Sequence, residues 1–583
     1  MNTFKTLALG VVLAGFGIAD AAAAVPAGPV FATFVSDKGL RAKESERYAQ
    51  VYVKSSNVGD TVFFQFGEGA KIDTLVLTKA NTLVNIKKTG LEGAGTVVKI
   101  WAPQTVWFLN INNNDATSFT PGTCATSVRE FRCENDSLNN MDFLPQMQAL
   151  EYLVSSNNRR VKSITVNNPN LQRLQLGKMP NLASLTVNAP VLYEFKLDMP
   201  LIPSLDVSGC PALKTFTLTK APNLASLKLS TGQVLESFTL SGSEKLAALE
   251  LKDMPKLKTV QVYENPGLAN VSLGNLPALA TMWLRQNHLT DYSISNLPAL
   301  RTLVLSNNPF TKLDINLPDL TSVTIDQCNL DTIDLRKLTV LKSCYVRKGN
   351  VKCVLFADNA LQNTATTFVL TENRMGISQL PPRPAKMNAS LNYYAPQAQP
   401  QLPTTIKAEE LLDLSDWTTG HTLDGTVPSV ITWETKFEEA LVEGTDYSVQ
   451  NGKYKFLHEI EDSVRCYITN KAFPAFARTV DSKGNVTDYR IISNFIKVDK
   501  KQGVTSLDSK SEVSVKAAGN LTIEIEGLPA EAPVFVYAAD GSEVAEAKGS
   551  TDTTIKLPAA GLYIVRAAGR SFKIYYYCPL KIF

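Results

Sequence analysis

Only a few side chains in this 583-residue chain could do acid–base or metal chemistry, and their spacing favours neither. The three histidines are His288, His421 and His458, and no two of them lie at the short separations typical of metal ligands on one element. The sequence contains no HExxH motif, no GxSxG elbow and no P-loop. We therefore predict no metal site and no cofactor.

Three further groups of residues have both a chemical and a plainer interpretation. Cys466 could act as a nucleophile with His458, but a cysteine packed within a strand explains it better. Asp413 and Asp416 could bind calcium, although a plain turn is the simpler interpretation. A carboxylate cluster could supply an acid–base pair or form a solvated loop face; it comprises Glu438, Glu439, Glu443 and Asp446. The sequence therefore does not favour an enzyme.

Aromatic and arginine side chains at matching positions of a repeated pattern point instead to binding. Such residues are unusual outside a core and are enriched in binding hot spots. We expect two outward-facing columns, one formed by Gln261, Trp283, Val304, Thr324 and Tyr345, the other by Tyr263, Arg285, Ser306, Asp326 and Arg347. The candidate ligand-binding residues are Tyr263, Trp283, Arg285, Tyr345 and Arg347.

A short repeat positions these residues. From Leu171 to Val351 an apolar residue opens a new unit about every ten or eleven positions, and apolar residues mostly return three and five places later, as in Leu300, Leu303 and Leu305. The alternation is typical of a strand, and the fixed longer period indicates stacked coils. Adjacent units differ in their turns, so the full period is two units, roughly 21 residues. We predict a mainly β chain built around a solenoid with parallel sheets.

One class of unit ends on a polar or small corner residue. The pattern LxxLxLxxN ends at Asn287, recurs at Asn308 and recurs again with Cys328 at the corner, while Cys210 holds a similar place in an earlier unit. This pattern resembles the leucine-rich repeat family, in particular short-period bacterial forms such as internalin-like and Bacteroidota surface proteins. The resemblance implies that the corner turns the chain inward and that Asn bonds the backbone of adjacent coils. Many earlier corners carry Ala, Met or Lys, so this ladder should be patchy in the first half.

Composition and pattern divide the chain into segments. Residues 1–24 have the positive start, apolar core and small residues of a secretory signal. Tyr393 and Tyr394, in a Pro-rich stretch, are expected to dock that stretch on the last coil. The expected segments are a signal peptide at 1–24, a cap at 25–72, the leucine-rich repeat solenoid at 73–381, a Pro-rich linker at 382–403, a β-sandwich at 404–498, a second linker at 499–511 and a small β-domain at 512–583.

The composition also restricts the partners. Hydrophobic residues make up 44% and charged residues 19% of the chain, which suits an ordered protein. The formal net charge is +3 with no basic block, so a nucleic-acid partner is not expected. No later segment is long and apolar enough for a transmembrane helix in the mature chain. Export would permit disulfides, for which Cys124–Cys133 and Cys344–Cys353 are the local candidates.

The last segment has a second resemblance. The strand Val534 to Tyr537, the turn Asp540-Gly541 and the strand that begins Gly561-Leu-Tyr are similar to the C-terminal sorting domains of Bacteroidota secretion. The resemblance implies export to the outer surface of a Gram-negative bacterium. The final residues, 577–583, run past the point at which such domains usually stop.

The preferred hypothesis is a secreted or cell-surface binding protein. The family resemblance implies a protein or glycoprotein ligand at a cell surface, with adhesion or host interaction as the usual outcome. One alternative is carbohydrate binding or processing by residues 404–498, where Trp417 and Trp433 are the available tryptophans and the repeats serve as scaffold. Another is a structural envelope protein without a discrete ligand. The oligomeric state and the disulfide pattern stay open at this stage.

Overall fold

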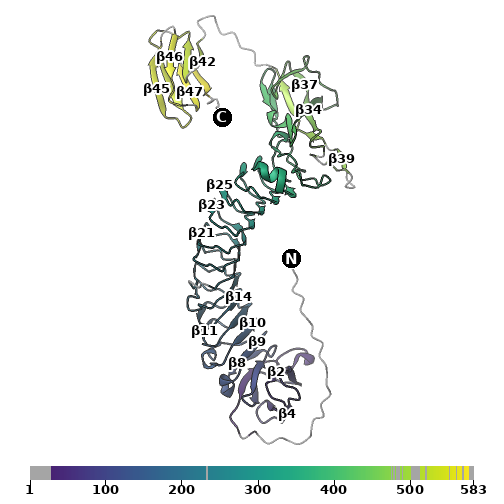
Figure 1. Cartoon of the computed structure of the whole chain (residues 1–583), viewed down its shortest axis with the longest axis vertical. Coiled ribbons are helices and arrows are strands. Elements are labelled where there is room, and N and C mark those ends of the chain that lie inside the picture. The colour runs from purple at the N-terminus through teal and green to yellow at the C-terminus, as the bar shows by residue number, and fades with distance from the viewer. Residues whose placement is uncertain are drawn as a thin grey trace. The chain divides into compact units, whose positions relative to one another are not determined.

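A computed structural model describes residues 26–576, with gaps at 27, 231–233, 475, 477–478, 481–485, 489, 501–512, 519–520, 529, 550–551, 560 and 568–569. The predicted signal peptide and residues 577–583 lie outside the described residues. The chain divides into two compact units, Met1–Asp499 and Lys500–Phe583, which are described separately below (Figure 1).

Strands dominate both units, as predicted from the sequence, and the helical turns are short. These turns are η1 (Glu44–Glu46), η2 (Gly122–Thr126), η3 (Leu144–Gln146), η4 (Ala360–Thr364), η5 (Ile377–Gln379) and η6 (Ser415–Trp417). Within the described ranges, no helix has the length and apolar character needed to cross a membrane.

An antiparallel sheet forms the N-terminal part of the first unit. Its strand order is β4-β3-β6-β1-β8, with β1 at Ala32–Ser36, β3 at Thr61–Phe66, β4 at Ile72–Val76, β6 at Thr96–Trp101 and β8 at Ala116–Thr120. We expected the cap to end at residue 72 and the first coil to begin there. Instead β4 is the edge strand of this sheet and pairs antiparallel with β3, so the antiparallel part is longer than residues 25–72.

A single long sheet then runs through the repeats. In order, its strands are β30 (Thr367–Val369), β28 (Ser343–Tyr345), β26 (Ser322–Thr324), β24 (Thr302–Val304), β22 (Thr281–Asn287), β20 (Thr259–Asn265), β18 (Ser237–Ser241), β16 (Thr215–Thr219), β14 (Glu194–Asp198), β12 (Arg173–Gly177), β10 (Tyr152–Ser156), β9 (Glu130–Glu134), β7 (Val106–Asn110), β2 (Tyr48–Ser55) and β5 (Val84–Thr89). Pairing is parallel from β7 onward. The predicted register holds, because Met282 faces Leu303 and Leu303 faces Val323.

The second face of the solenoid is built from short parallel pairs instead of one sheet. The pairs are β11 (Ser163–Asn167) with β13 (Ser184–Asn188), β15 (Ser204–Asp206) with β17 (Ser226–Lys228), β19 (Ala248–Lys252) with β21 (Asn270–Gly274), β23 (Asp291–Ser295) with β25 (Lys312–Asn316), and β27 (Thr332–Leu335) with β29 (Cys353–Phe356). Strands such as β11 and β21 lie opposite the long sheet, which contains β10 and β14 (Figure 1). Each coil thus contributes one strand to each face, which explains the two-unit period.

The solenoid core lies between these two faces. Every second residue of a strand points inward, as in β12, where Leu174 and Leu176 are buried and their neighbours are not. Three fully buried phenylalanines occupy one inward position in consecutive coils: Phe195, Phe216 and Phe238. Their rings stack with centroids 5.4 and 5.2 Å apart. The three rings therefore form a continuous apolar column through consecutive coils, which we call the phenylalanine spine.

The Pro-rich stretch after the repeats packs against them, as expected for its two tyrosines. Tyr393 and Tyr394 are almost fully buried, and the Tyr393 hydroxyl donates a hydrogen bond to the Pro381 carbonyl at 2.8 Å. The Tyr394 ring also lies 5.0 Å from that of Phe473, which belongs to the following module. The stretch therefore joins the last coil to the next module through buried contacts, so it does not act as a free spacer.

The module that follows has two sheets. One contains β31 (Thr405–Lys407), β33 (Thr419–Thr422), β34 (Gly425–Thr435), β37 (Ile460–Asn470), β40 (Ile491–Ile492) and β41 (Ile496–Asp499), and the other β32 (Leu411–Asp413), β35 (Tyr447–Gln450) and β36 (Lys453–Phe456). A short hairpin adds β38 (Thr479–Val480) and β39 (Val486–Asp488). The Trp433 ring is completely buried and contacts Tyr454 and Phe456 across the two sheets.

The second unit is a small pair of antiparallel sheets. One sheet contains β42 (Ser514–Ala518), β43 (Thr522–Glu526) and β46 (Asp552–Lys556), and the other β44 (Pro533–Ala538), β45 (Glu543–Lys548), β47 (Gly561–Ala567) and β48 (Arg570–Tyr576). The expected turn at Asp540-Gly541 joins β44 to β45, and Gly541 has the positive φ of 86° that favours glycine. This unit has its own buried core.

Candidate ligand-binding face

The outward side of β20 and β22 brings three of the candidate residues together. Tyr263 lies directly across from Arg285, and Gln261 across from Trp283. The Arg285 guanidinium is 5.1 Å from the centre of the Tyr263 ring and 5.8 Å from that of Trp283. All three side chains are partly exposed. We call Tyr263, Trp283 and Arg285 the arginine–aromatic patch.

Arg285 differs from the other arginines of this face in having no anionic partner. Arg132, Arg173 and Arg347 each pair with a carboxylate at 2.6 Å. Among the described residues, no carboxylate lies within ion-pair distance of Arg285, and its Nε atom is shielded from solvent without a hydrogen-bond partner. A shielded N–H without an acceptor costs free energy, and the partly exposed remainder of the guanidinium keeps N–H donors for an incoming anionic or carbonyl oxygen. The patch is therefore chemically suited to bind an acceptor.

Tyr345 and Arg347 form a separate cluster further along the same face. Tyr345 lies in the column of Trp283, but β24 and β26 separate their two strands. Arg347 is 5.5 Å from the Tyr345 ring and forms a two-pronged ion pair with Asp326, whose hydrogen bond raises the pKa of Arg347. Because Asp326 already satisfies this guanidinium, the cluster is less ready to take an anionic ligand than the patch.

The corner residues lie in the interior and connect coils. Asn287 donates from Nδ2 to the Val262 carbonyl at 3.0 Å, and Asn308 donates to the Leu284 carbonyl at 2.7 Å. Cys328 and Cys210 are buried at their corners. The column is polar at Asn114, Asp136 and Asn158, apolar at Met179 and Ala221, and polar again from Ser243 to Asn308, after which Cys328 interrupts it. The gap in the ladder thus lies in the first half of the array, where a patchy ladder was expected, although the coils that precede the gap are bonded.

Replacing one of these corners should weaken the array measurably. Asn308→Ala removes the donor to two buried carbonyls, those of Leu284 and Leu305, and the acceptor for the Leu289 N–H. We expect a loss of about 2 kcal/mol in unfolding free energy, measured by urea denaturation. Asn316→Ala, at an exposed asparagine that ends β25, serves as the control and should change stability little. Equal effects of the two substitutions would contradict the role of the corner.

Two of the groupings considered for catalysis or calcium binding have ordinary structural partners. His458 bonds the Glu459 carbonyl and the Asp446 carboxylate, whereas the Cys466 N–H bonds Ser493 and burial raises the pKa of its thiol to about 11. Asp413 accepts the Ser415 N–H as in an ordinary turn. No group of His, Cys, Asp and Glu in the described part of the chain could hold a metal ion.

The cysteines do not form the two local bridges that we considered. All seven cysteines in the described residues are free thiols, including both members of Cys124–Cys133 and of Cys344–Cys353. The reason is their place in the fold, since Cys133 and Cys344 are fully buried inward residues of β9 and β28. Cys578 lies outside the described residues.

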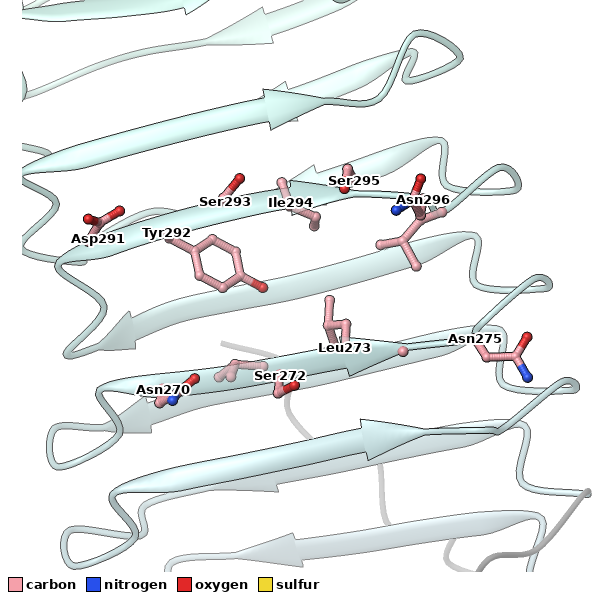
Figure 2. A pocket seen from close by; sticks show the side chains of 13 residues that line it. Asn270, Ser272, Leu273, Asn275, Asp291, Tyr292, Ser293, Ile294, Ser295 and Asn296 are labelled. Carbon is pink, nitrogen blue, oxygen red and sulfur yellow. The ribbon is translucent and has the colours of Figure 1, made fainter.

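A shallow gap on the second face is a consequence of the strand pairing. It lies between β21 and β23, which belong to separate pairs, and is lined by polar residues such as Asn270, Ser272 and Ser293 (Figure 2). A similar hollow lies between β13 and β15, where two other pairs adjoin. Because the gap recurs with the architecture, we do not assign it a ligand.

Comparison with known proteins gives structural similarity only. No protein-family model and no curated protein matches the chain. Among solved structures, the chain is similar to the functional domain of InlJ from Listeria monocytogenes, with 14% identity over 70% of this chain and 94% of that one and a TM-score of 0.36. An internalin-like protein of Listeria monocytogenes has 13% identity over 63% and 88%, with a TM-score of 0.26. YopM from Yersinia enterocolitica has 17% identity over 52% and 85%, with a TM-score of 0.23. Values this low assign no function.

Proposed function

We propose that this protein is an exported binding protein whose long sheet captures a protein ligand at a cell surface. The arginine–aromatic patch is the centre of the proposed contact, with Tyr345 and Arg347 at its periphery. The single observation that carries the proposal is the guanidinium of Arg285, which lies beside two aromatic rings on an outward strand face and has no carboxylate within ion-pair distance in the described residues. Arg, Trp and Tyr are the residue types that dominate binding hot spots.

The chemistry of the patch favours an acidic group on the ligand. A guanidinium presents a planar fork of donors that matches a carboxylate, and the neighbouring rings would pack on the apolar part of the same side chain. A partner contributing an Asp or Glu side chain at this point would supply both the missing charge and the missing acceptor.

A purely structural envelope role is less well supported, because it gives no reason for an unpaired cation on this face. Carbohydrate binding through residues 404–498 is also disfavoured. Trp433 is completely buried and Trp417 is only 9% exposed, so neither of them offers an aromatic platform to a sugar.

Export is part of the proposal and is supported by residues 1–24 of the sequence. We propose that the C-terminal unit serves in sorting or attachment, on the strength of its Asp540-Gly541 hairpin and its Gly561-Leu-Tyr strand. Fractionation of the native cells tests this part separately from the binding function.

Truncation of Arg285 should abolish most of the affinity without loss of stability. We expect Arg285→Ala and Trp283→Ala each to weaken ligand binding by about 10- to 100-fold, the range of a hot-spot residue. Arg285→Ala should leave the Tm unchanged or raise it, because the substitution removes a cation that has no partner. The ligand is first captured from extracellular and cell-surface proteins on the immobilised full chain, and Kd is then measured by calorimetry.

Arg347→Ala is the matched control on the same face. Its loss leaves Asp326 with the N–H of residue 347 but without a cation, so we expect a lower Tm and a Kd that rises far less than in the Arg285→Ala variant. Raising the salt concentration should weaken wild-type binding and have little further effect on the Arg285→Ala variant. Unchanged Kd in both Arg285→Ala and Trp283→Ala would show that the ligand binds elsewhere.

A further inference from the structure

A second, chemically different hollow lies where the N-terminal strands meet the first coils. Its walls come from five separate segments of the chain, and two partly exposed aromatic rings, Trp107 and Tyr152, contribute to them. Polar residues make up most of the remaining lining, among them Asn81, Gln104 and Thr126. We call this the Trp107 hollow.

The polar groups of the hollow are arranged around the indole. The Trp107 Nε1–H donates to Asn81 Oδ1 at 3.0 Å, which holds the ring in place. The Thr126 hydroxyl donates to Gln104 Oε1 at 3.0 Å, and the Gln104 side chain is itself held by the Thr123 carbonyl. These hydroxyl and amide groups are largely exposed and keep further donor and acceptor capacity.

The two charged residues that line the hollow compensate one another. Arg129 lies 3.8 Å from Glu151, so the single cation and the single anion of the lining face each other. The Lys54 ammonium approaches the Trp107 ring from the neighbouring strand β2, 5.3 Å from its centre. In contrast to the arginine–aromatic patch, this hollow has no uncompensated arginine to attract an acid.

The lining also lacks the aliphatic side chains against which an apolar side chain of a protein ligand would pack. Ala149 is its only aliphatic residue. A ligand that fits must therefore offer flat C–H faces to the two rings and hydroxyl groups to the amides and hydroxyls. A sugar ring has this combination, because its C–H bonds and its hydroxyls point in different directions.

We propose that the Trp107 hollow binds a neutral oligosaccharide, independently of the protein-binding patch on β20 and β22. The Trp107 and Tyr152 rings contact the faces of the sugar units, and the side chains of Asn81, Gln104 and Thr126 bond its hydroxyls. The site differs in place from the carbohydrate hypothesis for residues 404–498, and it does not depend on the proposed protein ligand.

The test uses the full chain on an array of neutral and acidic oligosaccharides, followed by calorimetry with the best neutral binder. We expect Trp107→Ala and Tyr152→Ala each to weaken that binding by more than about tenfold, and Trp107→Phe to retain most of it because stacking survives. Binding should be insensitive to salt, since no charge is neutralised. Trp283→Ala and Arg285→Ala are matched controls, and both should bind the sugar like the wild type.

Variants of exposed polar residues in the hollow distinguish a loss of sugar binding from a loss of folding. Gln104→Ala and Thr126→Ala change only exposed polar groups, keep the fold and should each weaken sugar binding severalfold. The absence of neutral-sugar binding by the wild type, or binding that survives both Trp107→Ala and Tyr152→Ala, would overturn the proposal. Selective binding of acidic peptides by this hollow would overturn it as well.

Discussion

At pH 7 the Asp136→Asn variant should be more stable than the wild type by on the order of 4 kcal/mol, taking the folded and ordinary pKa values as about 8 and 3.8. Asp136 occupies a buried corner of the first coils. Its Oδ1 accepts the N–H groups of Asn114 and Ala116 at 2.8 and 3.1 Å, while Oδ2 is buried without a partner. Burial raises the pKa of Asp136 to about 8, although the two N–H bonds oppose this shift.

The same titration makes wild-type stability depend on pH. The folded pKa lies above the unfolded one, so the native state keeps a proton that the unfolded chain loses from about pH 4 upward. Wild-type stability therefore falls as the pH rises from about 4 to 8 and then levels off. The asparagine variant lacks this titration, so the two proteins should converge near pH 4 and differ most above pH 8.

An asparagine also suits the geometry of this corner. Asn158, in the next coil, uses Nδ2 to donate to the Cys133 carbonyl at 2.6 Å, whereas Asp136 has no such donor when ionised. Calorimetric scans at about pH 4, 6 and 8 measure the predicted divergence. Parallel Tm curves for the two proteins over this range would contradict a buried, protonated Asp136.

The second large effect is expected at the centre of the phenylalanine spine. Phe216→Ala should cost about 3–5 kcal/mol, because it leaves a cavity between two rings that remain in place. The loss of two stacked contacts, to Phe195 and Phe238, adds roughly 0.5–1.5 kcal/mol for each pair. The stability of a repeat array is approximately a sum of unit and interface terms, so a weak interface also divides the array. Urea unfolding should therefore change from one transition to two.

Phe216→Leu separates the cavity from the loss of the ring. Leucine stands at the same inward position in an earlier coil, as Leu174 in β12, so this variant should retain most of the stability and a single transition. Circular dichroism and tryptophan emission follow the unfolding. A similar loss in Phe216→Leu and Phe216→Ala would mean that ring stacking, and not cavity formation, dominates this interface.

The repeat region could be predicted well because its period is local information. Met282, Leu303 and Val323 lie at the same place in three successive coils, so counting along the repeat predicts that all three point inward. The structure places them in register. The cap boundary could not be predicted in the same way. Ile72–Val76 alternates like a coil strand, and only its antiparallel pairing with β3 distinguishes it. Strand alternation reports burial on one face and carries no information about the partner strand.

For the candidate site as well, the sequence predicted the residues but not their partners. Arg285 and Arg347 hold equivalent places in the repeat, and the sequence treats them alike. Asp326 compensates one of them, whereas the other lies against two rings with no carboxylate within ion-pair distance in the described residues. The Trp107 hollow was not predicted at all, because residues between 56 and 152 form it together and share no pattern.

Sequence periodicity alone predicts that this chain forms stacked β coils, which residues point inward, and that aromatic and arginine residues recur on the outward face. These properties depend on hydrophobic periodicity, which each strand carries alone. The packing of the coils sets which cation has a partner, which corner carboxyl is buried and which distant segments share a hollow. Those properties depend on distances between coils and on exclusion of water, which arise only when the coils pack.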